Sequence, residues 1–406
     1  MSQLLAYLQD SELVARFQRR CGLYLIQEEE EGAAEAHPNA SPDQPCQTGT
    51  ASTDETLAHL RQRFDNNNSN WGYKENGHCV RERSGPEYEV RAPLLHLLFL
   101  FSSALGHEVF YISCLPWLHW NLDPFLCRRL VNMWTVVMYV GQVLKDLLKL
   151  PRPLSPPVVK LEKRVVAEYG LPSTHAMAAT AISFTFLYSA PSRIQFPFEV
   201  GLIVAVTLSS LVCLSRIYTG MHSVLDVICG ISISFCILSI TYPFWDTFDH
   251  YQLTSPLSPL FGIGLPLLLS YTYPDLGHYS TTRGDTTTIL GVCAGCSVGY
   301  WFNAQLGETF EPKDTLPVPL PKVTGTAFTY GTVRFILGVL ALVGTRQLVK
   351  MASLHFLYWV YKVPKSDQNA RKRKEIEVPY KFVTYTSVGL VNSILVNRAF
   401  VYMGLL

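Results

Sequence analysis

Three short polar clusters carry the side chains in this sequence that could do chemistry, and each lies at the end of a long apolar stretch. Their members are cations, hydroxyls, imidazoles and one carboxylate, in the order Lys145 and Arg152, then Ser173, Thr174 and His175, then Arg216, His222 and Asp226. A charged group beside the hydrocarbon of a membrane is a functional hypothesis by default. The combination of cations with histidines predicts the binding and transfer of a phosphoryl group.

The cations are spaced to surround an anion. Lys145 and Arg152 lie seven residues apart, about two helical turns, so we expect both to point the same way from one helix end. Pro151 and Pro153 should then stop that helix. Arg216 adds a third cation, and two guanidiniums with one ammonium can hold the oxygens of a phosphate.

The two histidines and the carboxylate fit nucleophilic catalysis. His222 and Asp226 lie four residues apart on a presumed helix, so the carboxylate can accept from one imidazole nitrogen and leave the other as a nucleophile. His175 begins the next helix, where it can protonate a leaving oxygen. The backbone N–H groups at that helix start also favour an anion.

Each of these residues has a simpler interpretation when taken alone. A Lys or Arg at the end of a membrane helix usually extends its charge to the interface, and a lone His in such a place is more often structural. Three clusters in this order, bracketing one helical hairpin and sharing one membrane face, are much harder to obtain by chance. We therefore favour the functional interpretation.

The elements that position these clusters are apolar helices. Lys, Arg, Asp and Glu make up only 16% of the 406 residues, against about 25% in soluble domains, and the mean hydropathy is +0.16. A net charge of +1 leaves no footprint of a nucleic-acid binder. The sequence predicts an all-α, polytopic transmembrane helical bundle with about nine spans, at 94–118, 130–144, 176–192, 200–215, 227–245, 251–274, 286–307, 323–345 and 382–406.

Three regions follow from this pattern. Residues 1–91 are predicted to be a polar, mostly disordered tail with a possible amphipathic helix that lies on a membrane or on the protein itself. Residues 92–250 form the catalytic transmembrane core. Residues 251–406 add further transmembrane helices and a basic segment, and small residues at 291, 295 and 299 predict close helix packing rather than a metal site at Cys293 and Cys296.

The clusters read K-x6-R-P, P-S-x-H and S-R-x5-H-x3-D, which are the three motifs of the phosphatidic acid phosphatase type 2 (lipid phosphate phosphatase) superfamily. Their context, KDLLKLPRPLSPPVVKLEKRVVAEYGLPSTHAMAATA and CLSRIYTGMHSVLDV, resembles the sphingosine-1-phosphate phosphatases. The resemblance implies a superfamily-type core, an integral membrane phosphatase for sphingoid base phosphates and a phosphohistidine on His222. It also implies that Asp226 orients His222, that His175 is the acid and then the base, and that Lys145, Arg152, Ser173, Thr174 and Arg216 bind phosphate. Many relatives have Gly where Thr174 stands, whereas the sphingosine-phosphate branch carries Thr.

No Asp/Glu cluster suited to Mg²⁺ lies beside the motifs, so we expect neither a metal nor another cofactor. The expected partners are the sphingoid base phosphate and the lipid bilayer, without nucleic acid. Two alternatives remain open. The same chemistry could act on glycerolipid phosphates or glucose-6-phosphate, or the chain could be an idle membrane scaffold or transporter, although idle relatives typically lose motif residues.

The resemblance implies an endoplasmic reticulum membrane protein with a lumenal active site. The basic stretch from Lys362 to Lys374 should be cytosolic by the positive-inside rule. A lumenal site and a cytosolic basic stretch are compatible only if the chain crosses the membrane between Met351 and Tyr361. Eleven helical residues reach only about 16 Å, which is less than the roughly 30 Å of hydrocarbon in a bilayer. The sequons at Asn39 and Asn67 would report the side of the polar tail.

Overall fold

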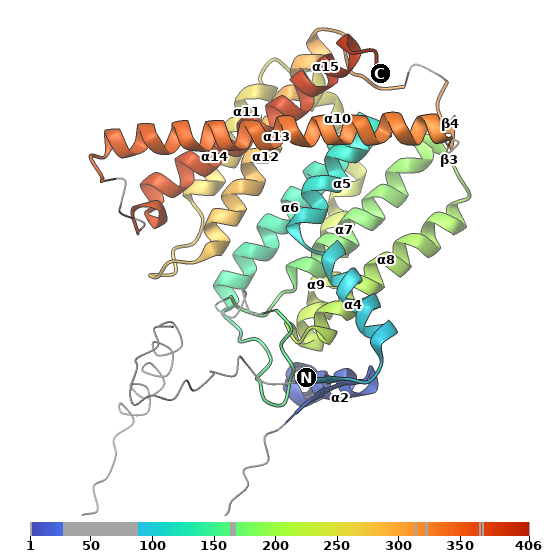
Figure 1. Ribbon diagram of the computed structural model, residues 1–406, viewed down its shortest axis with the longest axis vertical. Coiled ribbons are helices and arrows are strands. Elements are labelled where there is room, and N and C mark those ends of the chain that lie inside the picture. Colours follow the sequence, from blue (N-terminus) through green and yellow to red (C-terminus); the bar gives the residue numbers. More distant parts are fainter. Residues whose placement is uncertain are drawn as a thin grey trace, which may run out of the picture. The chain divides into compact units, whose positions relative to one another are not determined.

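The computed structural model describes residues 2–26, 88–162, 168–312, 315–320, 324–364, 367 and 369–405. Residues 27–87 of the expected tail, with both sequons, therefore lie outside the described residues, whereas its last residues, 88–90, form a short strand. Residues 1–25 and 88–406 form one compact unit. Its helices, in chain order (Figure 1), are α1 (Ser2–Gln9), α2 (Ser11–Arg20), α4 (Pro93–Leu105), α5 (Glu108–Asn121), α6 (Pro124–Leu148), α7 (Thr174–Ser189), α8 (Phe198–Tyr218), α9 (Val224–Thr241), α10 (Trp245–Thr254), α11 (Ser258–Tyr271), α12 (Thr281–Gln305), α13 (Gly325–Val360), α14 (Lys374–Leu390) and α15 (Asn397–Tyr402).

Two small β pairs tie the helices together, and the predicted all-α class is confirmed. Strand β1 (Leu23–Leu25) pairs antiparallel with β2 (Tyr88–Val90), whereas β3 (Ile194–Gln195) pairs in parallel with β4 (Val318–Pro319). A π-helical turn at Val391–Val396 joins α14 to α15. Such short strands close loops and do not build a sheet.

Local signals fix where the core helices begin and end. Asp123 caps α6 by accepting from the backbone N–H of Phe125 at 2.8 Å, and Ser173 caps α7. Ser223 and Asp226 form a reciprocal capping box at the start of α9. Helix α6 ends with Lys149 in the left-handed conformation, at φ 52°. These caps satisfy the N–H groups that a helix start leaves without partners.

Each of the nine stretches predicted to cross the membrane is mostly helical in the described residues, although 94–118 is interrupted between α4 and α5 and 251–274 between α10 and α11. Within the described ranges, three helical segments are long and apolar enough to cross: α8, the continuous stretch Val224–Thr254 and α13. The pair α4 and α5 adds a fourth if its two parts, bent by 65°, count as one span. Helix α6 is not among them, and it carries buried charges, including Arg128, which pairs with Asp249 of α10, and Lys145, which pairs with Glu168 of the loop after α6. The count of nine spans stays a prediction.

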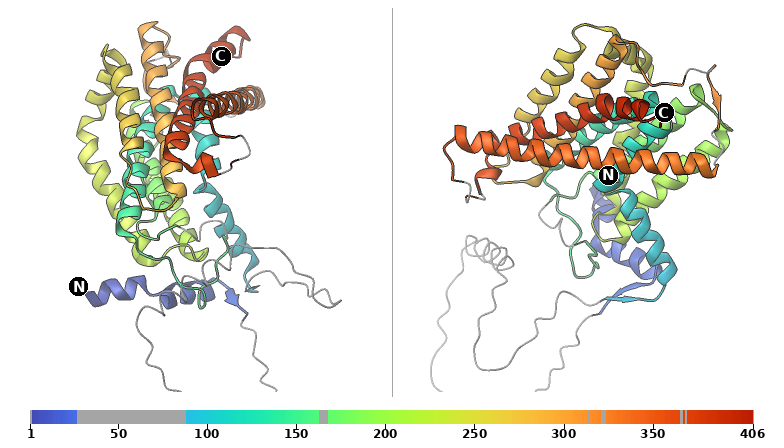
Figure 2. Two further views of the ribbon diagram at one scale, coloured as in Figure 1. Left: turned by 90° about the vertical axis from the view of Figure 1, so that its left-hand side faces the viewer. Right: turned by 45° about the horizontal axis from the view of Figure 1, so that its top comes forward.

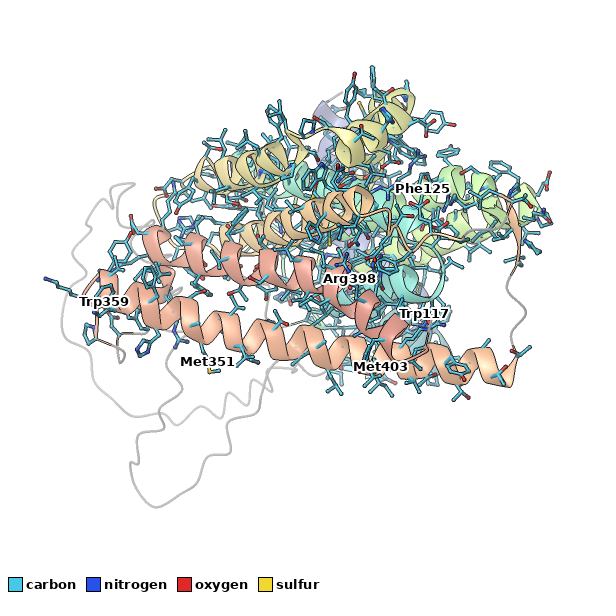
Figure 3. All side chains as sticks on the ribbon, turned by 90° about the horizontal axis from the view of Figure 1, so that it is seen from above. Trp117, Phe125, Met351, Trp359, Arg398 and Met403 are labelled. Atoms are coloured by element: carbon cyan, nitrogen blue, oxygen red, sulfur yellow. The ribbon has the colours of Figure 1, made fainter. Side chains whose placement is uncertain are left out.

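Helix α13 is the longest described element and its outer face is apolar. Its 36 residues correspond to about 54 Å, more than the roughly 30 Å of hydrocarbon in a bilayer. Figure 3 shows Met351 and Trp359 on this helix, and their side chains are 60% and 74% exposed. Such a face suits contact with lipid.

The small residues of α12 allow close packing against α14, as predicted. A Cβ at position 295 would lie 2.1 Å from the carbonyl oxygen of Thr386, and one at position 291 would lie 3.0 Å from that of Phe382. At position 299 it would meet the Ser393 side chain at 2.6 Å. Glycine is therefore required at 295, where the two backbones nearly touch.

The amphipathic N-terminal helix lies on the protein itself. Figure 2 shows α1 and α2 running across one end of the bundle. The buried Gln18 of α2 donates to the carbonyls of Val159 and Tyr218 at 2.7 and 2.8 Å and accepts from the N–H of Val159. One amide thus ties α2 to the loop after α6 and to the end of α8.

The basic stretch lies at the same end of the bundle as the loop after α6. Arg283, near the start of α12, donates to the carbonyl of Lys372 at 3.0 Å and pairs with Glu377 at 2.7 Å. Thr281, also at this helix start, donates to Glu168 of the loop at 3.4 Å. Helix α13 continues unbroken from Gly325 to Val360, so residues 351–361 do not form a separate helix of their own.

Candidate active site

The eight predicted site residues gather where four core helices end. Lys145 lies in the last turn of α6, His175 in the first turn of α7, Arg216 in the last turn of α8 and Asp226 in the first turn of α9. The backbone N–H of Ser173 donates to the carbonyl of Asp226 at 3.0 Å. The starts of α7 and α9 are thereby fastened to each other, in the lower part of the bundle in Figure 1.

The three cations are buried, and two carboxylates of the loop 149–173 hold them. Arg216, whose side chain is 1% exposed, donates from Nη1 to Glu162 Oε1 at 2.9 Å and from Nη2 to Oε2 at 3.0 Å. Lys145 Nζ and Arg152 Nη2 each lie 3.4 Å from Glu168 Oε2. The Nζ of Lys145 also lies 3.4 Å from Thr174 Oγ1. Cations from three parts of the chain therefore share one site.

Arg152 reaches the site by a different route from the one predicted. Helix α6 ends at Leu148, so Lys145 and Arg152 do not occupy two successive turns of a helix. Arg152 instead donates from Nε to the carbonyl of Glu168 at 2.9 Å and from Nη1 to that of Met221 at 3.1 Å. The left-handed Lys149 turns the chain back toward the site, and these two carbonyls fix the guanidinium.

His222 and Asp226 lie close together without the predicted helical spacing. His222 precedes the N-cap of α9, so the two residues do not share a helix face. The His222 Nδ1 lies 3.5 Å from Asp226 Oδ2, which also accepts from the backbone N–H of Ser223 at 2.8 Å. Within the described part of the chain, Nδ1 has no hydrogen-bond partner at shorter range. Catalytic contacts of this kind often shorten only when substrate binds.

The break between α4 and α5 brings a second imidazole to His175. The ring of His107, at the break, meets that of His175 edge-on with centroids 6.0 Å apart, and its Nε2 lies 3.9 Å from Glu162 Oε1. At Gly106 a Cβ would lie 3.1 Å from His175 Cδ2. His107 therefore faces this site.

The electrostatics of the site favour a neutral His222 and an ionised Glu162. Burial, and then the cations Arg152, Lys145 and Arg216, hold the pKa of His222 well below its usual value. For Glu162, burial alone would raise the pKa, but Arg216, Ser103 and His107 together lower it. A neutral imidazole and a carboxylate are therefore the forms present at neutral pH.

One turn in the loop before His222 admits only glycine. Gly220 has φ +71°, and a Cβ there would lie 2.2 Å from the carbonyl oxygen of Val159. Val159 belongs to the segment 158–161 of the loop after α6, which also contacts Gln18 and the backbone of Thr219. The loop after α6 and the loop before α9 therefore pack backbone against backbone, and this contact positions His222.

Sequence reasoning missed three residues that touch the site: Ser103, Glu162 and Glu168. Ser103 Oγ donates to Glu162 at 2.9 Å and accepts from Arg216 at 2.8 Å. Glu162 and Glu168 lie in a polar loop where no helical or motif spacing marks them. The available signal was that a buried cation needs a carboxylate partner and that these two stand between the first and second motifs.

An apolar cavity of about 490 Å³ begins beside the site. Its lining comes mainly from α5, α7 and α8, including Ile182, Leu208 and Val212, and also from Leu105 at the end of α4. The Cγ1 of Val212 would lie 3.2 Å from a Cβ at Gly106, on the same side as His175. The cavity therefore approaches the site near Gly106 and His175, although none of the eight predicted site residues lines it.

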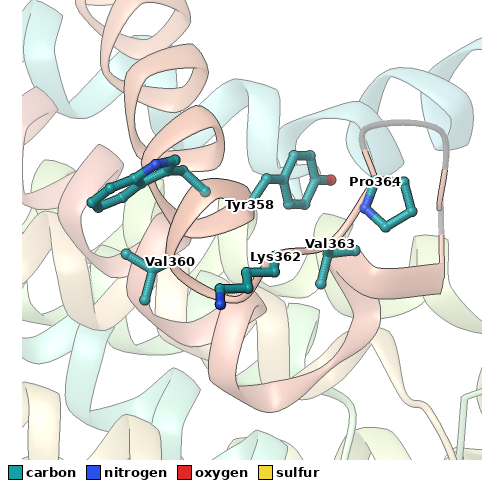
Figure 4. Close-up of a pocket in the computed structure, with 6 residues that line it drawn as sticks. Tyr358, Val360, Lys362, Val363 and Pro364 are labelled. Carbon is teal, nitrogen blue, oxygen red and sulfur yellow. The ribbon is translucent and has the colours of Figure 1, made fainter.

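A further hollow, of about 710 Å³, lies at the end of α13 and shares no lining residue with the site (Figure 4). It is lined by Tyr358, Trp359, Val360, Lys362, Val363 and Pro364. Among the described residues, no group of three or more His, Cys, Asp or Glu side chains is arranged to hold a metal ion.

Comparison with known proteins agrees with this geometry. Residues 127–249 match the model of the PAP2 superfamily. Over the full length of both chains, the sequence is 47% identical to human sphingosine-1-phosphate phosphatase 2 and 45% identical to the mouse protein of that name. It is 37% identical to mouse sphingosine-1-phosphate phosphatase 1, over 100% of this chain and 98% of the relative. No solved structure matches significantly.

Proposed function

We propose that this chain, which belongs to the sphingosine-1-phosphate phosphatase family, hydrolyses the phosphomonoester of sphingoid base phosphates within a membrane. The observation that carries the proposal is the meeting of three cations, whose side chains are at most 6% exposed, with two histidines at one end of the bundle, near an apolar cavity. The cavity favours a substrate with one long chain over glucose-6-phosphate, because a sugar offers no apolar surface to bury.

In the first step, Nε2 of His222 attacks phosphorus while the bond from phosphorus to the sphingoid oxygen breaks. His175 donates a proton to that oxygen, so the base leaves as a neutral alcohol. Asp226, 3.5 Å from Nδ1, stabilises the imidazole as it becomes positive. The role of His222 as nucleophile is supported by its lowered pKa, which keeps the imidazole neutral at neutral pH.

In the second step, water attacks the phosphohistidine, and His175 accepts its proton as phosphate departs. Lys145, Arg152 and Arg216 bind the equatorial oxygens in both steps, with Ser173, Thr174 and the start of α7 beside them. The protein itself thus compensates the charge of the five-coordinate phosphorus. Vanadate, which adopts this geometry, should inhibit in competition with substrate, and EDTA should leave the activity intact.

We also propose that the protein resides in the endoplasmic reticulum membrane with this site on the lumenal side. The family resemblance supports that orientation. It requires that the basic stretch before α14 is lumenal too, because Arg283 and Thr281 tie both regions to the start of α12. Labelling of a single cysteine at Lys372 in sealed vesicles tests this: labelling from outside, without permeabilisation, would contradict a lumenal site.

The substrate is tested with the purified full-length chain in detergent, by measuring kcat/KM for sphingosine-1-phosphate, lysophosphatidate and glucose-6-phosphate in parallel. We expect sphingosine-1-phosphate to be preferred by more than tenfold over each of the others. Equal turnover of glucose-6-phosphate would support a sugar phosphatase. No turnover of any of the three would support an idle membrane relative.

A further inference from the structure

The carboxylate of Glu162 binds the guanidinium of Arg216, which the proposed function assigns to the phosphoryl group. Both of its oxygens accept from Arg216, at 2.9 and 3.0 Å, and Ser103 donates to one of them. The Nε of Arg216 is buried and has no hydrogen-bond partner among the described residues. A phosphate that binds Arg216 must therefore compete with the carboxylate of Glu162 for this cation.

Displacing Glu162 is costly unless another cation replaces Arg216. The Glu162 side chain is only 17% exposed, and a largely buried carboxylate without a partner is strongly destabilising. A substrate that carries only negative charge leaves Glu162 in that condition. A substrate with its own positive charge next to the phosphate instead exchanges ion pairs, phosphate with Arg216 and its cation with Glu162.

The substrate class of the proposed function carries such a cation. In a sphingoid base phosphate, an ammonium group sits on the carbon next to the one that bears the phosphate. In an in-line displacement, the sphingoid base leaves on the side of phosphorus opposite His222. Its ammonium group therefore lies on the same side as His175, which protonates the leaving oxygen. Glu162 belongs to that side, because its Oε1 lies 3.9 Å from His107, whose ring packs on His175.

We propose that Glu162 is a specificity-determining residue whose carboxylate binds the ammonium group of the sphingoid base once phosphate has taken its place on Arg216. This inference rests on the proposed function and names how the same site selects its substrate. Glu168 provides the comparison, because it contacts the cations Lys145 and Arg152, assigned to the equatorial oxygens, and Thr281.

The test compares sphingosine-1-phosphate with its deamino analogue, in which hydrogen replaces the amino group. We expect wild type to prefer the aminated substrate by at least tenfold in kcat/KM. Glu162→Gln keeps the size of the side chain and its acceptor for Ser103 but loses the charge. It should lower kcat/KM for sphingosine-1-phosphate by about 10- to 100-fold, the range for hydrogen bonds to charged groups. It should raise kcat/KM for the analogue, because a neutral Gln is not left as an unpaired charge when phosphate binds Arg216.

The matched variant is Glu168→Gln, which makes the same change on the other carboxylate and should alter both substrates alike. Glu162→Asp, which retains the charge, should restore part of the preference. A parallel loss on both substrates in Glu162→Gln would mean that Glu162 only positions Arg216. If wild type fails to hydrolyse sphingosine-1-phosphate, the proposed function fails; if it succeeds and Glu162→Gln keeps the preference, only this inference fails.

A measurement on wild type alone tests the same claim without any variant. Phosphoethanolamine carries its ammonium at the spacing found in the sphingoid head group, and ethyl phosphate is the matched compound without it. We expect phosphoethanolamine to inhibit at roughly tenfold lower concentration. Equal inhibition by the two compounds would overturn the assignment of Glu162 to the ammonium.

Discussion

A cluster of cations with buried side chains lies at each end of α6, and the two clusters differ in how the cations are paired with carboxylates. At the start of α6, Arg128 pairs with Asp249 at 3.2 Å, and Arg193 pairs with Asp123 at 2.6 Å and Glu311 at 2.9 Å. Two of these carboxylates, Asp123 and Asp249, are themselves buried. This far-end cluster is a closed set of ion pairs that joins α6 to neighbouring segments.

At the other end of α6, both carboxylates come from a loop and not every donor is used. Arg216 binds Glu162 closely, but its Nε has no partner among the described residues, and Lys145 and Arg152 approach Glu168 only to 3.4 Å. Burial and charge are thus common to both ends. The site end adds spare donors, two histidines and an apolar cavity, and these features distinguish a binding site from a structural ion-pair network.

The first way to break this comparison is to remove the nucleophile. His222→Ala should lower kcat by more than a hundredfold without unfolding the protein, because the side chain lies in a loop before α9 and caps no helix. The thermal unfolding midpoint in detergent should stay within a few degrees of wild type. Retention of more than a hundredth of the activity would remove His222 from this role.

The second change removes the proton donor. His175→Ala should lower the rate on sphingosine-1-phosphate by about 10² to 10⁴. The first turnover of a nitrophenyl phosphate should suffer much less, since nitrophenolate departs without a proton. Rapid-mixing measurement of nitrophenol release checks this, and equal losses on both substrates would indicate that His175 only shapes the site.

The same substitution at both ends of α6 sharpens the comparison. Arg152→Lys keeps the charge but loses the planar fork, so kcat/KM should fall about 10- to 100-fold with little change in stability. Arg128→Lys should instead lower the free energy of unfolding by roughly 1–3 kcal/mol while the folded fraction keeps its kcat. If Arg128→Lys lost activity without losing stability, the two clusters would not divide in this way.

The smallest expected effect concerns pH. Because burial and neighbouring cations lower the pKa of His222, the acid limb of kcat/KM should lie well below pH 6.5. Arg152→Met removes a cation that opposes protonation, so the limb should move up by roughly one unit. Arg152→Lys, compared on the same substrate, should leave it in place. A limb that stays fixed in Arg152→Met would mean that it does not report His222.

The sequence predicted which motif residues would gather, but it predicted neither all of their geometry nor the contacts of Ser103, Glu162 and Glu168. Fixed spacings identified Lys145, His175 and His222, because a phosphoryl site demands those side chains. The helical arguments for Arg152 and for His222 with Asp226 were wrong, since Lys149 ends α6 in a left-handed turn and Ser223 starts α9 one residue after His222. Caps of this kind depend on local geometry that spacing alone does not reveal.

Contacts between distant segments were beyond the reach of the sequence. Glu162 pairs with a cation 54 residues away, and Gln18 binds a loop 141 residues away. Neither residue belongs to a periodic pattern, so only the folded chain brings them to the site. By contrast, the regular spacing of Gly291, Gly295 and Gly299 predicted the close packing of α12 correctly, because a helix repeats every few residues.

The formation of a phosphohistidine on His222 is tested most directly by trapping it. His175→Ala should accept phosphate from ³²P-labelled nitrophenyl phosphate, because that step needs no proton donor, and should release it slowly, because the base for water is absent. After quenching in alkali, where phosphohistidine survives, we predict a label that is lost in acid and maps to the peptide containing His222. Absence of label, or label that persists when His222 is also replaced by Ala, would contradict the mechanism.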